Sequence, residues 1–211
     1  LGVVQKFSPD GNFLQEIGNG SGWGDGMFRS PSGLAIDDFG NIYVADLLNY
    51  RIQKFSPTGE FIAKWGSQGS GPGQFESVQD VEIDSDGNIV VTDGANHRIQ
   101  LFTPDGIYID EIIFGYEDFP YQIRPSQISF TSDGKLLIVD SENDLILKFH
   151  YRGSLITHWG KTSVEPGQFH SPDGIDIDSN NNIFVADSIN QRIQVFNSAG
   201  SLLSLWGTEG T

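Results

Sequence analysis

Hydrophobic and polar residues alternate in short runs along most of the chain, and turn-forming residues separate the runs. In one stretch, an alternating run at 33–37 is followed by a turn at 38–41, a second run at 41–45 and a loop. A third run at 51–55 turns at 56–59 and leads into a fourth run at 60–65. Alternation with a period of two predicts β-strands, and the short turns predict antiparallel hairpins. The pattern therefore predicts groups of four short strands, with no helical stretch anywhere.

The same pattern returns every 47 residues, so the chain is built from repeats. The residues that recur at this spacing are Pro31, Val78, Pro125 and Pro172; Asp46, Asp93, Asp140 and Asp187; Phe55, Phe102, Phe149 and Phe196; and Gly59, Gly106, Gly153 and Gly200. A tryptophan column holds Trp65, Trp159 and Trp206. Phe7, Gly11 and Ile17 precede their counterparts by 48 residues, so the N-terminal segment is half a repeat with one inserted residue.

Four antiparallel strands in each repeat of this length are typical of a β-propeller blade. A twisted four-stranded sheet cannot cover both of its own faces, and stacking against neighbouring blades supplies the missing cover. We therefore predict an all-β fold in which residues 1–211 form a single propeller domain or a fragment of one. The expected parts are a half blade at 1–27 and four complete blades at roughly 28–74, 75–121, 122–168 and 169–211.

The segments Asn-Ile-x-Val-Ala-Asp and Asn-x-Arg-Ile-Gln-x-Phe, followed by Trp-Gly, resemble the NHL repeat over the whole chain. The resemblance implies a propeller, typically six-bladed, that most often serves as an interaction platform. It also implies that some relatives bind RNA, and that some distant propellers are lyases or hydrolases with a metal at the axis. The third complete copy departs most: residues 120–123 replace the usual linker, Leu145 replaces the arginine, and Ile112-Ile113 replaces Trp-Gly. We expect that blade to deviate locally.

Four and a half blades do not close a six-bladed ring, so we expect the chain to be part of a longer protein. Two alternatives remain open: a five-bladed ring that lacks two inner strands, and closure by self-association through open blade edges, which expose backbone groups and apolar surface.

Composition narrows the classes of function. The chain has 28 acidic and 12 basic residues and a net charge of −16, which argues against binding nucleic acid through its phosphates or docking on anionic lipid. It has no cysteine, which excludes disulfides, thiolate zinc sites and cysteine nucleophiles. No apolar run is long enough to span a membrane. We expect no nucleic-acid partner and no membrane insertion.

Most recurring polar residues are interpreted as structural. In the unit Asp-x-x-Asn-x-Arg, the aspartate is expected to bond the loop backbone and to pair with the arginine. The tryptophan column is expected to pack between blades. Residues required by the repeat recur in every copy, so a specific function should lie where the copies differ.

The resemblance to the NHL repeat implies that the linkers and the loops after each second strand share one rim, and the copies differ at these positions. The candidate binding residues are Arg29, Leu47, Leu48, Tyr50, Glu76, His97, Glu142, Asp144, His170 and Trp23. Leu47 and Leu48 with Tyr50 form a small apolar patch with an aromatic anchor, which is typical of protein-binding surfaces. Trp23 lies in the inserted first linker, outside the repeat column, and is expected to be exposed.

A second set of candidates lies at the mouth of the predicted axis. Asp80, Gln127 and Asp173 present oxygen ligands, which suit Ca²⁺ better than Zn²⁺.

Three hypotheses about function follow from these observations, in order of preference. The first is a non-enzymatic interaction module without a cofactor, in a larger extracellular or cell-surface protein, binding a protein or another ligand at the rim. The second is a propeller-type lyase or hydrolase with a metal at the axis. The third is an RNA-binding propeller, which the acidic charge disfavours.

Overall fold

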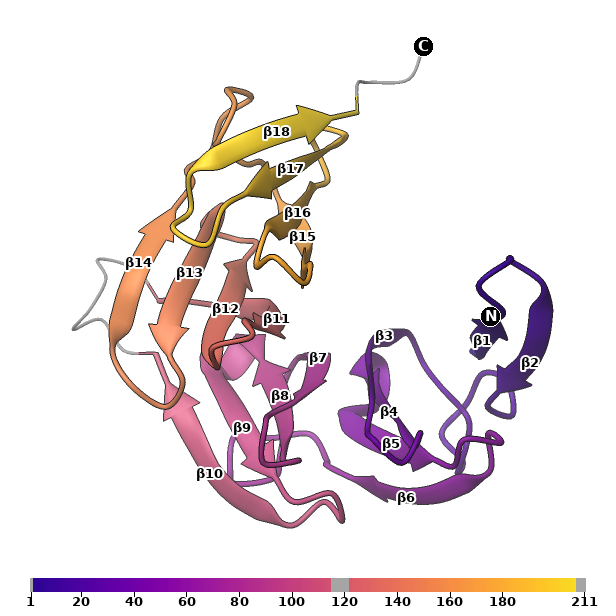
Figure 1. Ribbon diagram of the computed structural model, residues 1–211. Helices are drawn as coiled ribbons and strands as arrows, with labels where there is room; N and C mark the ends of the chain where they lie inside the picture. The colour runs from indigo at the N-terminus through magenta and orange to yellow at the C-terminus, as the bar shows by residue number, and fades with distance from the viewer. Residues whose placement is uncertain (1, 115–121, 208–211) are drawn as a thin grey trace. The chain divides into compact units, whose positions relative to one another are not determined.

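The computed structural model describes residues 2–114 and 122–207, and its regular structure is almost entirely β-strand (Figure 1). The chain divides into two compact units, Leu1–Glu111 and Ile112–Thr211. The described residues of both units contain no α-helix.

The first unit holds a two-stranded hairpin and two four-stranded antiparallel sheets. The hairpin consists of β1 (Val4–Phe7) and β2 (Phe13–Ile17). The strands of the first sheet are, in order across the sheet, β3 (Pro31–Ile36), β4 (Ile42–Asp46), β5 (Arg51–Phe55) and β6 (Phe61–Trp65). Those of the second sheet are β7 (Val78–Ile83), β8 (Ile89–Asp93), β9 (Arg98–Phe102) and β10 (Tyr108–Ile113), the last of which runs across the boundary between the units.

The second unit repeats the same topology twice. The strands of its first sheet are β11 (Pro125–Phe130), β12 (Lys135–Asp140), β13 (Leu145–His150) and β14 (Leu155–Trp159). Those of its second sheet are β15 (Pro172–Ile177), β16 (Ile183–Asp187), β17 (Arg192–Phe196) and β18 (Leu202–Trp206). The predicted all-β fold of four-stranded antiparallel blades is therefore confirmed.

Burial along the strands explains why each sheet needs a neighbour. Every residue of β4 and β5 is buried, whereas exposure alternates along β6 at the outer edge of the same sheet. Middle strands are buried in full only when both faces of a sheet are covered, and an outer strand keeps one wet face. The middle strands β4 and β5 therefore contribute most of the core between neighbouring sheets.

Two of the three column tryptophans, Trp65 and Trp159, pack between sheets, as predicted. The third, Trp206 on β18, is 50% exposed, and its ring lies 6.0 Å from Phe184 on β16 of its own sheet. Trp65 on β6 lies 6.0 Å, ring centre to ring centre, from Phe102 on the neighbouring β9, and Trp159 on β14 lies 5.7 Å from Phe196 on β17. Glycine is needed beside the first tryptophan, because a Cβ on Gly106 would come within 2.6 Å of the Trp65 ring. Packing this close makes each blade depend on its neighbour.

Two loops depart from the prediction of no helix. The chain forms single 3₁₀ turns at Leu47–Asn49 and Gly94–Asn96, each directly after the second strand of its sheet. The backbone of Tyr50 is left-handed (φ 54°), and its N–H closes the first turn by donating to the Leu47 carbonyl at 3.2 Å. Such a turn reverses the chain between two middle strands in few residues, which alternation in the sequence does not reveal.

The departing copy keeps its sheet. The strands β11–β14, which include Leu145, retain the regular order and antiparallel pairing of the other blades. The predicted change in the linker at 120–123 lies largely at residues 120 and 121, which are outside the described residues. The replacement of arginine by Leu145 therefore leaves the topology of the sheet unchanged.

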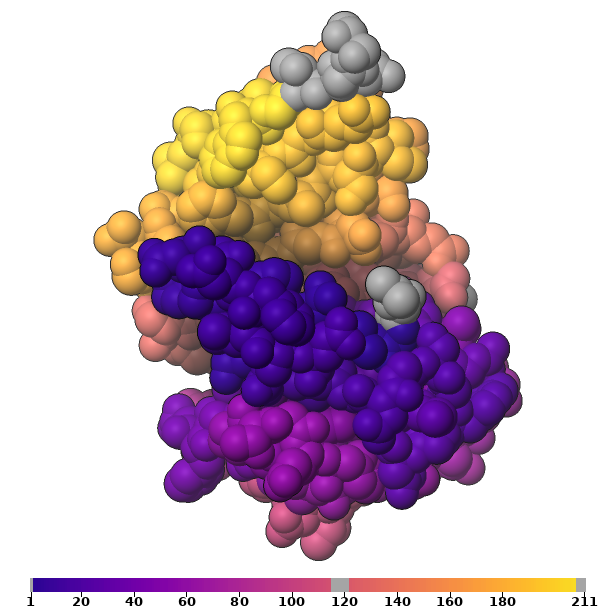
Figure 2. Space-filling view, turned by 90° about the vertical axis from the view of Figure 1, so that its right-hand side faces the viewer, coloured from indigo at the N-terminus to yellow at the C-terminus, as the bar shows by residue number. Residues whose placement is uncertain are grey.

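Apolar side chains also lie on the surface of the N-terminal hairpin, coloured indigo in Figure 2. Phe7, Phe13 and Leu14 are 51%, 54% and 55% exposed.

Among the described residues, no helix has the length and apolar character needed to cross a membrane.

Candidate functional site

A buried ion pair at the end of β4 fixes the loop and the linker around it. Asp46 is fully buried, and Arg51 Nε donates to its Oδ2 at 2.9 Å. The same guanidinium donates to the backbone oxygens of Trp23 (3.0 Å), Gly24 (2.8 Å) and Met27 (2.6 Å). A buried charge is tolerated when it is paired and its hydrogen bonds are used. Arg51 therefore clamps the linker before β3 to the blade.

Two other copies contain the same ion pair, so the structural interpretation of the repeated aspartate is confirmed there. Arg98 donates to Asp93 at 3.0 Å, and Arg192 donates to Asp187 at 2.7 Å. In both copies the arginine also bonds carbonyls of the preceding linker. The clamp is therefore a property of the repeat and carries no specificity of its own.

The copy with Leu145 lacks the arginine, and its aspartate is held by other hydrogen-bond donors. Asp140 is fully buried and accepts hydrogen bonds from the backbone N–H of Arg124 and from both the backbone and the side chain of Asn143. Burial raises the pKa of Asp140, because these bonds only partly offset the loss of hydration of the charged form.

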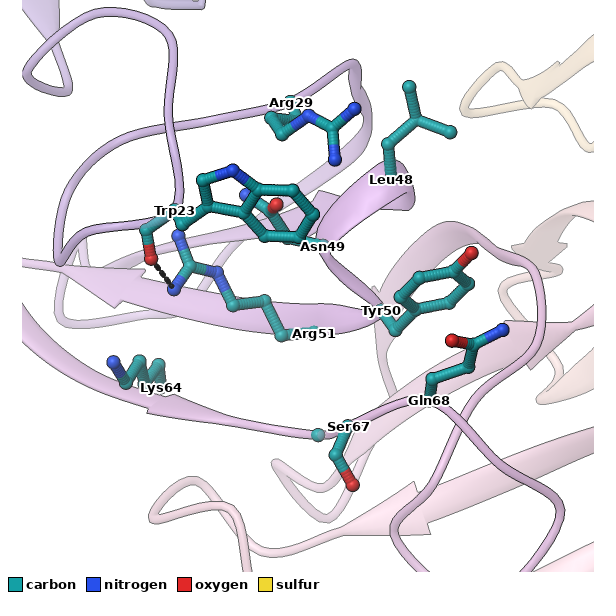
Figure 3. A pocket seen from close by; sticks show the side chains of 10 residues that line it. Trp23, Arg29, Leu48, Asn49, Tyr50, Arg51, Lys64, Ser67 and Gln68 are labelled. Carbon is teal, nitrogen blue, oxygen red and sulfur yellow. Dashed lines mark hydrogen bonds between the residues drawn. The ribbon is translucent and has the colours of Figure 1, made fainter.

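Beside the Asp46–Arg51 pair lies an open pocket of about 580 Å³ (Figure 3). Three segments form it: the linker before β3, the loop between β4 and β5, and the end of β6 with the residues after it. The residues that line this rim pocket are Trp23, Arg29, Leu48, Asn49, Tyr50, Arg51, Lys64, Gly66, Ser67 and Gln68. Four of the predicted rim candidates, Trp23, Arg29, Leu48 and Tyr50, therefore meet here.

Trp23 and Arg29 form a stacked pair at the mouth of the rim pocket. The guanidinium carbon of Arg29 lies 4.2 Å from the centre of the Trp23 ring, and Trp23 is 67% exposed. Both backbones are held: Arg51 bonds the Trp23 carbonyl, and the Arg29 N–H donates to Asp46 Oδ1 at 2.6 Å. Leu48 N–H in turn donates to the Arg29 carbonyl at 3.0 Å. An exposed aromatic side chain is thus presented on a backbone of fixed geometry.

The linker that carries Trp23 follows the same path as the other linkers, and Trp23 lies outside the tryptophan column of the fourth strands, as predicted. Arg51 Nη1 bonds the Trp23 carbonyl as Arg192 Nη1 bonds the Val164 carbonyl. Trp23 therefore replaces Val164 of that linker, and also Ser70, which lies 47 residues after it.

The inserted residue lies earlier in the same linker. The Phe28 N–H donates to the Gly20 carbonyl, and the Phe75 N–H donates to the Ser67 carbonyl in the same way. The two phenylalanines are 47 residues apart, and so are Gly20 and Ser67. Gly18 and Gly66 share a φ near +107° (106° and 108°) but are 48 apart. The extra residue is therefore Asn19, and it leaves the position of Trp23 within the repeat unchanged.

The backbone at Tyr50 is dictated by the repeat, whereas the side chain is not. Tyr50, His97, Asp144 and Gln191 occupy the same column, and all four have a left-handed backbone with φ between 51° and 57°. This conformation costs an L-residue about 1–2 kcal/mol, so the fold imposes it. The four side chains are chemically unrelated, and the fold therefore leaves the choice at this position free.

The rim pocket also contains residues that sequence reasoning missed. Lys64, Ser67 and Gln68 come from the end of β6 and the segment after it. The Lys64 ammonium pairs with Asp25, and Gln68 Nε2 donates to Glu76 Oε1 at 3.0 Å. Their position in the repeat could have indicated that they lie at the rim, because the chain passes from each fourth strand into a linker there.

The other rim candidates lie outside the rim pocket. Leu47 is half-buried beside it, and His97 is half-buried in the corresponding loop of the next sheet. In the second unit, Glu142 pairs with Arg124, and the His170 N–H donates to Asp187 at 2.8 Å.

The expectation that Asp144 is exposed on the rim is wrong. Asp144 is buried (6% exposed), with its carboxylate accepting hydrogen bonds from the Ser171 N–H and the Thr162 hydroxyl. Its acceptor capacity is used to hold the next linker, which explains its burial.

The axis candidates are distributed over both units. Asp80 on β7 is buried, its Oδ1 accepts the Val81 N–H at 2.9 Å, and a Cβ on Gly33 would approach that oxygen to 2.3 Å. Gln127 lies on β11 and Asp173 on β15 of the second unit. Within 2–114 and 122–207, no group of three or more His, Cys, Asp and Glu residues could hold a metal ion. The Ca²⁺ site, which includes a glutamine, stays a prediction.

Comparison with known proteins identifies the class. Residues 27–122 match the family described as a 6-bladed beta-propeller (DUF5128), and residues 169–196 match the NHL repeat. A search of curated proteins finds no match. The fold is that of a β-propeller protein built from antiparallel blades. Its last blade carries an NHL repeat, as the recurring residues predict.

Solved structures support the same class. A streptogramin B lyase is 18% identical with a TM-score of 0.71, over 100% of this chain and 63% of that one. A catalytically inactive virginiamycin B lyase from Staphylococcus aureus with Quinupristin is 17% identical with a TM-score of 0.71, over 99% and 64%. A protein of unknown function from Bacteroides caccae is 14% identical with a TM-score of 0.69, over 98% and 74%. The chain thus spans less than two thirds of the length of either lyase, and the likeness shows the fold alone.

Proposed function

We propose that the chain is an interaction module that docks a protein partner on its rim pocket, within a larger extracellular or cell-surface protein. The observation that carries this proposal is the stacked pair of Trp23 and Arg29 beside Leu48, which is 46% exposed. Tryptophan, tyrosine and arginine are the residues most often found as binding hot spots. Because the hydrogen bonds of Arg51 and Asp46 already hold the backbone, little ordering is left to oppose binding.

The comparison between blades supports the same proposal. A residue that the fold requires recurs in each copy, as the clamping aspartate does. Trp23 corresponds to Ser70 and Val164, and Arg29 corresponds to Glu76 and Ile123. Large side chains that the fold does not need, gathered around one pocket and partly exposed, are accounted for by a partner that covers them.

The test is a selection of binders from a displayed library of random dodecapeptides. Peptides that bind the wild-type protein are measured against Trp23→Ala and against Phe39→Ala. Phe39 is a matched control, because it is an exposed aromatic residue (85%) in the β3–β4 turn of the same sheet and does not line the rim pocket. Circular dichroism and thermal unfolding of both variants check that they fold.

We expect Trp23→Ala to weaken the selected peptides at least about tenfold, which corresponds to about 1.4 kcal/mol. Phe39→Ala is expected to leave their affinity unchanged. A selection that returns no peptide sensitive to Trp23→Ala, or peptides equally sensitive to both variants, would contradict the proposal.

A lyase activity is the second candidate, because two solved structures with this fold are lyases and align with the whole chain. Fold alone does not carry activity from one propeller to another. Incubation with quinupristin, followed by liquid chromatography and fragment-ion mass spectrometry to detect its conversion to a new compound, tests the candidate directly. Turnover that is lost in Asp80→Asn, with the fold retained, would favour the enzyme over the interaction module.

A further inference from the structure

We propose that the rim pocket selects an acidic peptide segment of its partner, with a carboxylate of that segment held by Arg29. This inference rests on the proposed function, since it names the chemistry of the partner that the rim pocket binds. It follows from the charges that line the pocket, from the way Arg29 is held, and from the apolar surface next to it.

Three cationic side chains line the rim pocket, and two of them are already neutralised. Arg51 is paired with the buried Asp46, and Lys64 is paired with Asp25. The guanidinium of Arg29 lies over the Trp23 ring instead, and it has no carboxylate within 4.0 Å among residues 2–114 and 122–207. Arg29 is therefore the cation of the pocket whose charge is left for a ligand.

The described arginines emphasise this difference. Four of them form ion pairs with carboxylates, namely Arg51, Arg98, Arg124 and Arg192. Arg29 and Arg152 stack on aromatic rings instead. In a chain of net charge −16, carboxylates are plentiful, so an arginine at a pocket mouth without one is a notable exception.

Stacking prepares Arg29 for a carboxylate. A guanidinium that lies over an indole ring keeps its N–H groups in its own plane, where they stay available as donors. A carboxylate accepts two parallel N–H bonds from such a fork, which a neutral amide cannot match in charge. Since the backbone N–H of Arg29 is bonded to Asp46, the fork is presented from a fixed base.

The apolar part of the pocket sets the second requirement. Trp23, Leu48 and Tyr50 lie around the same pocket in Figure 3, and the first two are exposed. They suit an apolar side chain next to the acidic residue of the segment. An acidic residue flanked by an apolar one is therefore the minimal element that uses both parts.

Other carboxylates near the pocket are engaged elsewhere. Asp25 pairs with Lys64, and Glu76 accepts a hydrogen bond from Gln68. More distant acidic residues are screened, because the Debye length is about 8 Å at physiological ionic strength. The overall negative charge therefore slows the approach of an acidic segment without removing its contact with Arg29.

The experiment uses the peptides selected on the wild-type protein. Those sensitive to Trp23→Ala are sequenced, and each is resynthesised with blocked ends, once with its Asp and Glu residues and once with Asn and Gln in their place. Affinities are measured for the wild-type protein, Arg29→Gln and Arg29→Lys. Phe39→Ala again serves as the matched control.

We expect the Trp23-sensitive peptides to be enriched in Asp and Glu, and the amide versions to bind the wild-type protein about fivefold more weakly or worse. Arg29→Gln should bind the acidic and amide versions alike, while Arg29→Lys should recover part of the discrimination. Equal affinities for acidic and amide versions on the wild-type protein would overturn this inference and leave the proposed function intact. The absence of any Trp23-sensitive peptide would overturn both.

Discussion

Replacing Arg51 by leucine tests whether the buried ion pair holds the linker and the rim pocket in place. The chain contains its own precedent, since Leu145 occupies the corresponding position of another blade. In Arg51→Leu, Asp46 would stay fully buried but lose the guanidinium 2.9 Å away. The backbone carbonyls of Trp23, Gly24 and Met27 would lose their donor at the same time.

The expected cost follows from these contacts. Removing one partner of a buried ion pair costs about 3–5 kcal/mol, because it leaves a buried charge uncompensated. The three linker carbonyls are only partly buried, so water can replace the lost donor and they add little. We therefore expect Arg51→Leu to lower the free energy of unfolding by about 3–5 kcal/mol.

Urea unfolding followed by circular dichroism measures that loss, and amide hydrogen exchange locates it. The Phe28 N–H, which donates to the Gly20 carbonyl at 3.0 Å, should lose protection in Arg51→Leu. The matched control is Arg124→Leu, whose ion pair with Glu142 has side chains that are 43% and 57% exposed. A surface pair contributes at most about 1 kcal/mol, so the control should unfold close to wild type.

Two results would refute the reasoning about the clamp. One is an equal loss of stability in Arg51→Leu and Arg124→Leu, which would make burial of the pair irrelevant. The other is a large loss of stability with wild-type protection of the linker amide, which would mean that the linker is held without the arginine.

Three further predictions concern the blades. Burial raises the pKa of Asp140, so the folded state binds the carboxyl proton more tightly than the unfolded state does. The free energy of unfolding should therefore fall as pH rises from the ordinary aspartate range through the raised value. Asp140→Asn should remove that part of the pH dependence, as urea unfolding between pH 4 and 7 at about one-unit steps would show. Gly106→Ala should cost more than Gly87→Ala by about 1–3 kcal/mol in the same assay, because both have φ near +80° (80° and 82°) but only at Gly106 does the new Cβ meet a tryptophan ring. Trp159→Ala should lower stability by about 3–5 kcal/mol, and Trp206→Ala, whose side chain is 50% exposed, by less than half as much, as thermal unfolding would show.

The fold was predictable in detail because its determinants are local and repeated. Alternation between 51 and 55 and the turn at 56–59 match β5 and the turn that follows it. The pairing of Asp46 with Arg51 was predictable for the same reason, since two middle strands joined by a short loop bring these residues opposite each other. The 3₁₀ turn at Leu47–Asn49 was missed, because loop conformation leaves no periodic signal.

The candidate site was predictable only in part. Arg29, Leu48 and Tyr50 were identifiable as positions where the blades differ, but nothing local shows that Arg29 stacks on Trp23. Asp144 occupies the same column as Tyr50, yet it is buried because its carboxylate holds the next linker. Which column positions face solvent depends on what each side chain finds nearby.

By itself, the sequence determined the strands, the four-stranded blades and the residues that recur to hold them, because hydrophobic alternation and turn chemistry act between near neighbours. Only the tertiary structure decided that Trp23, Arg29, Leu48, Tyr50, Lys64 and Gln68 surround one pocket, and that Lys64 is neutralised while Arg29 is not. These residues come from three segments of the chain, and the distances and charges between segments arise only when the sheet brings them together.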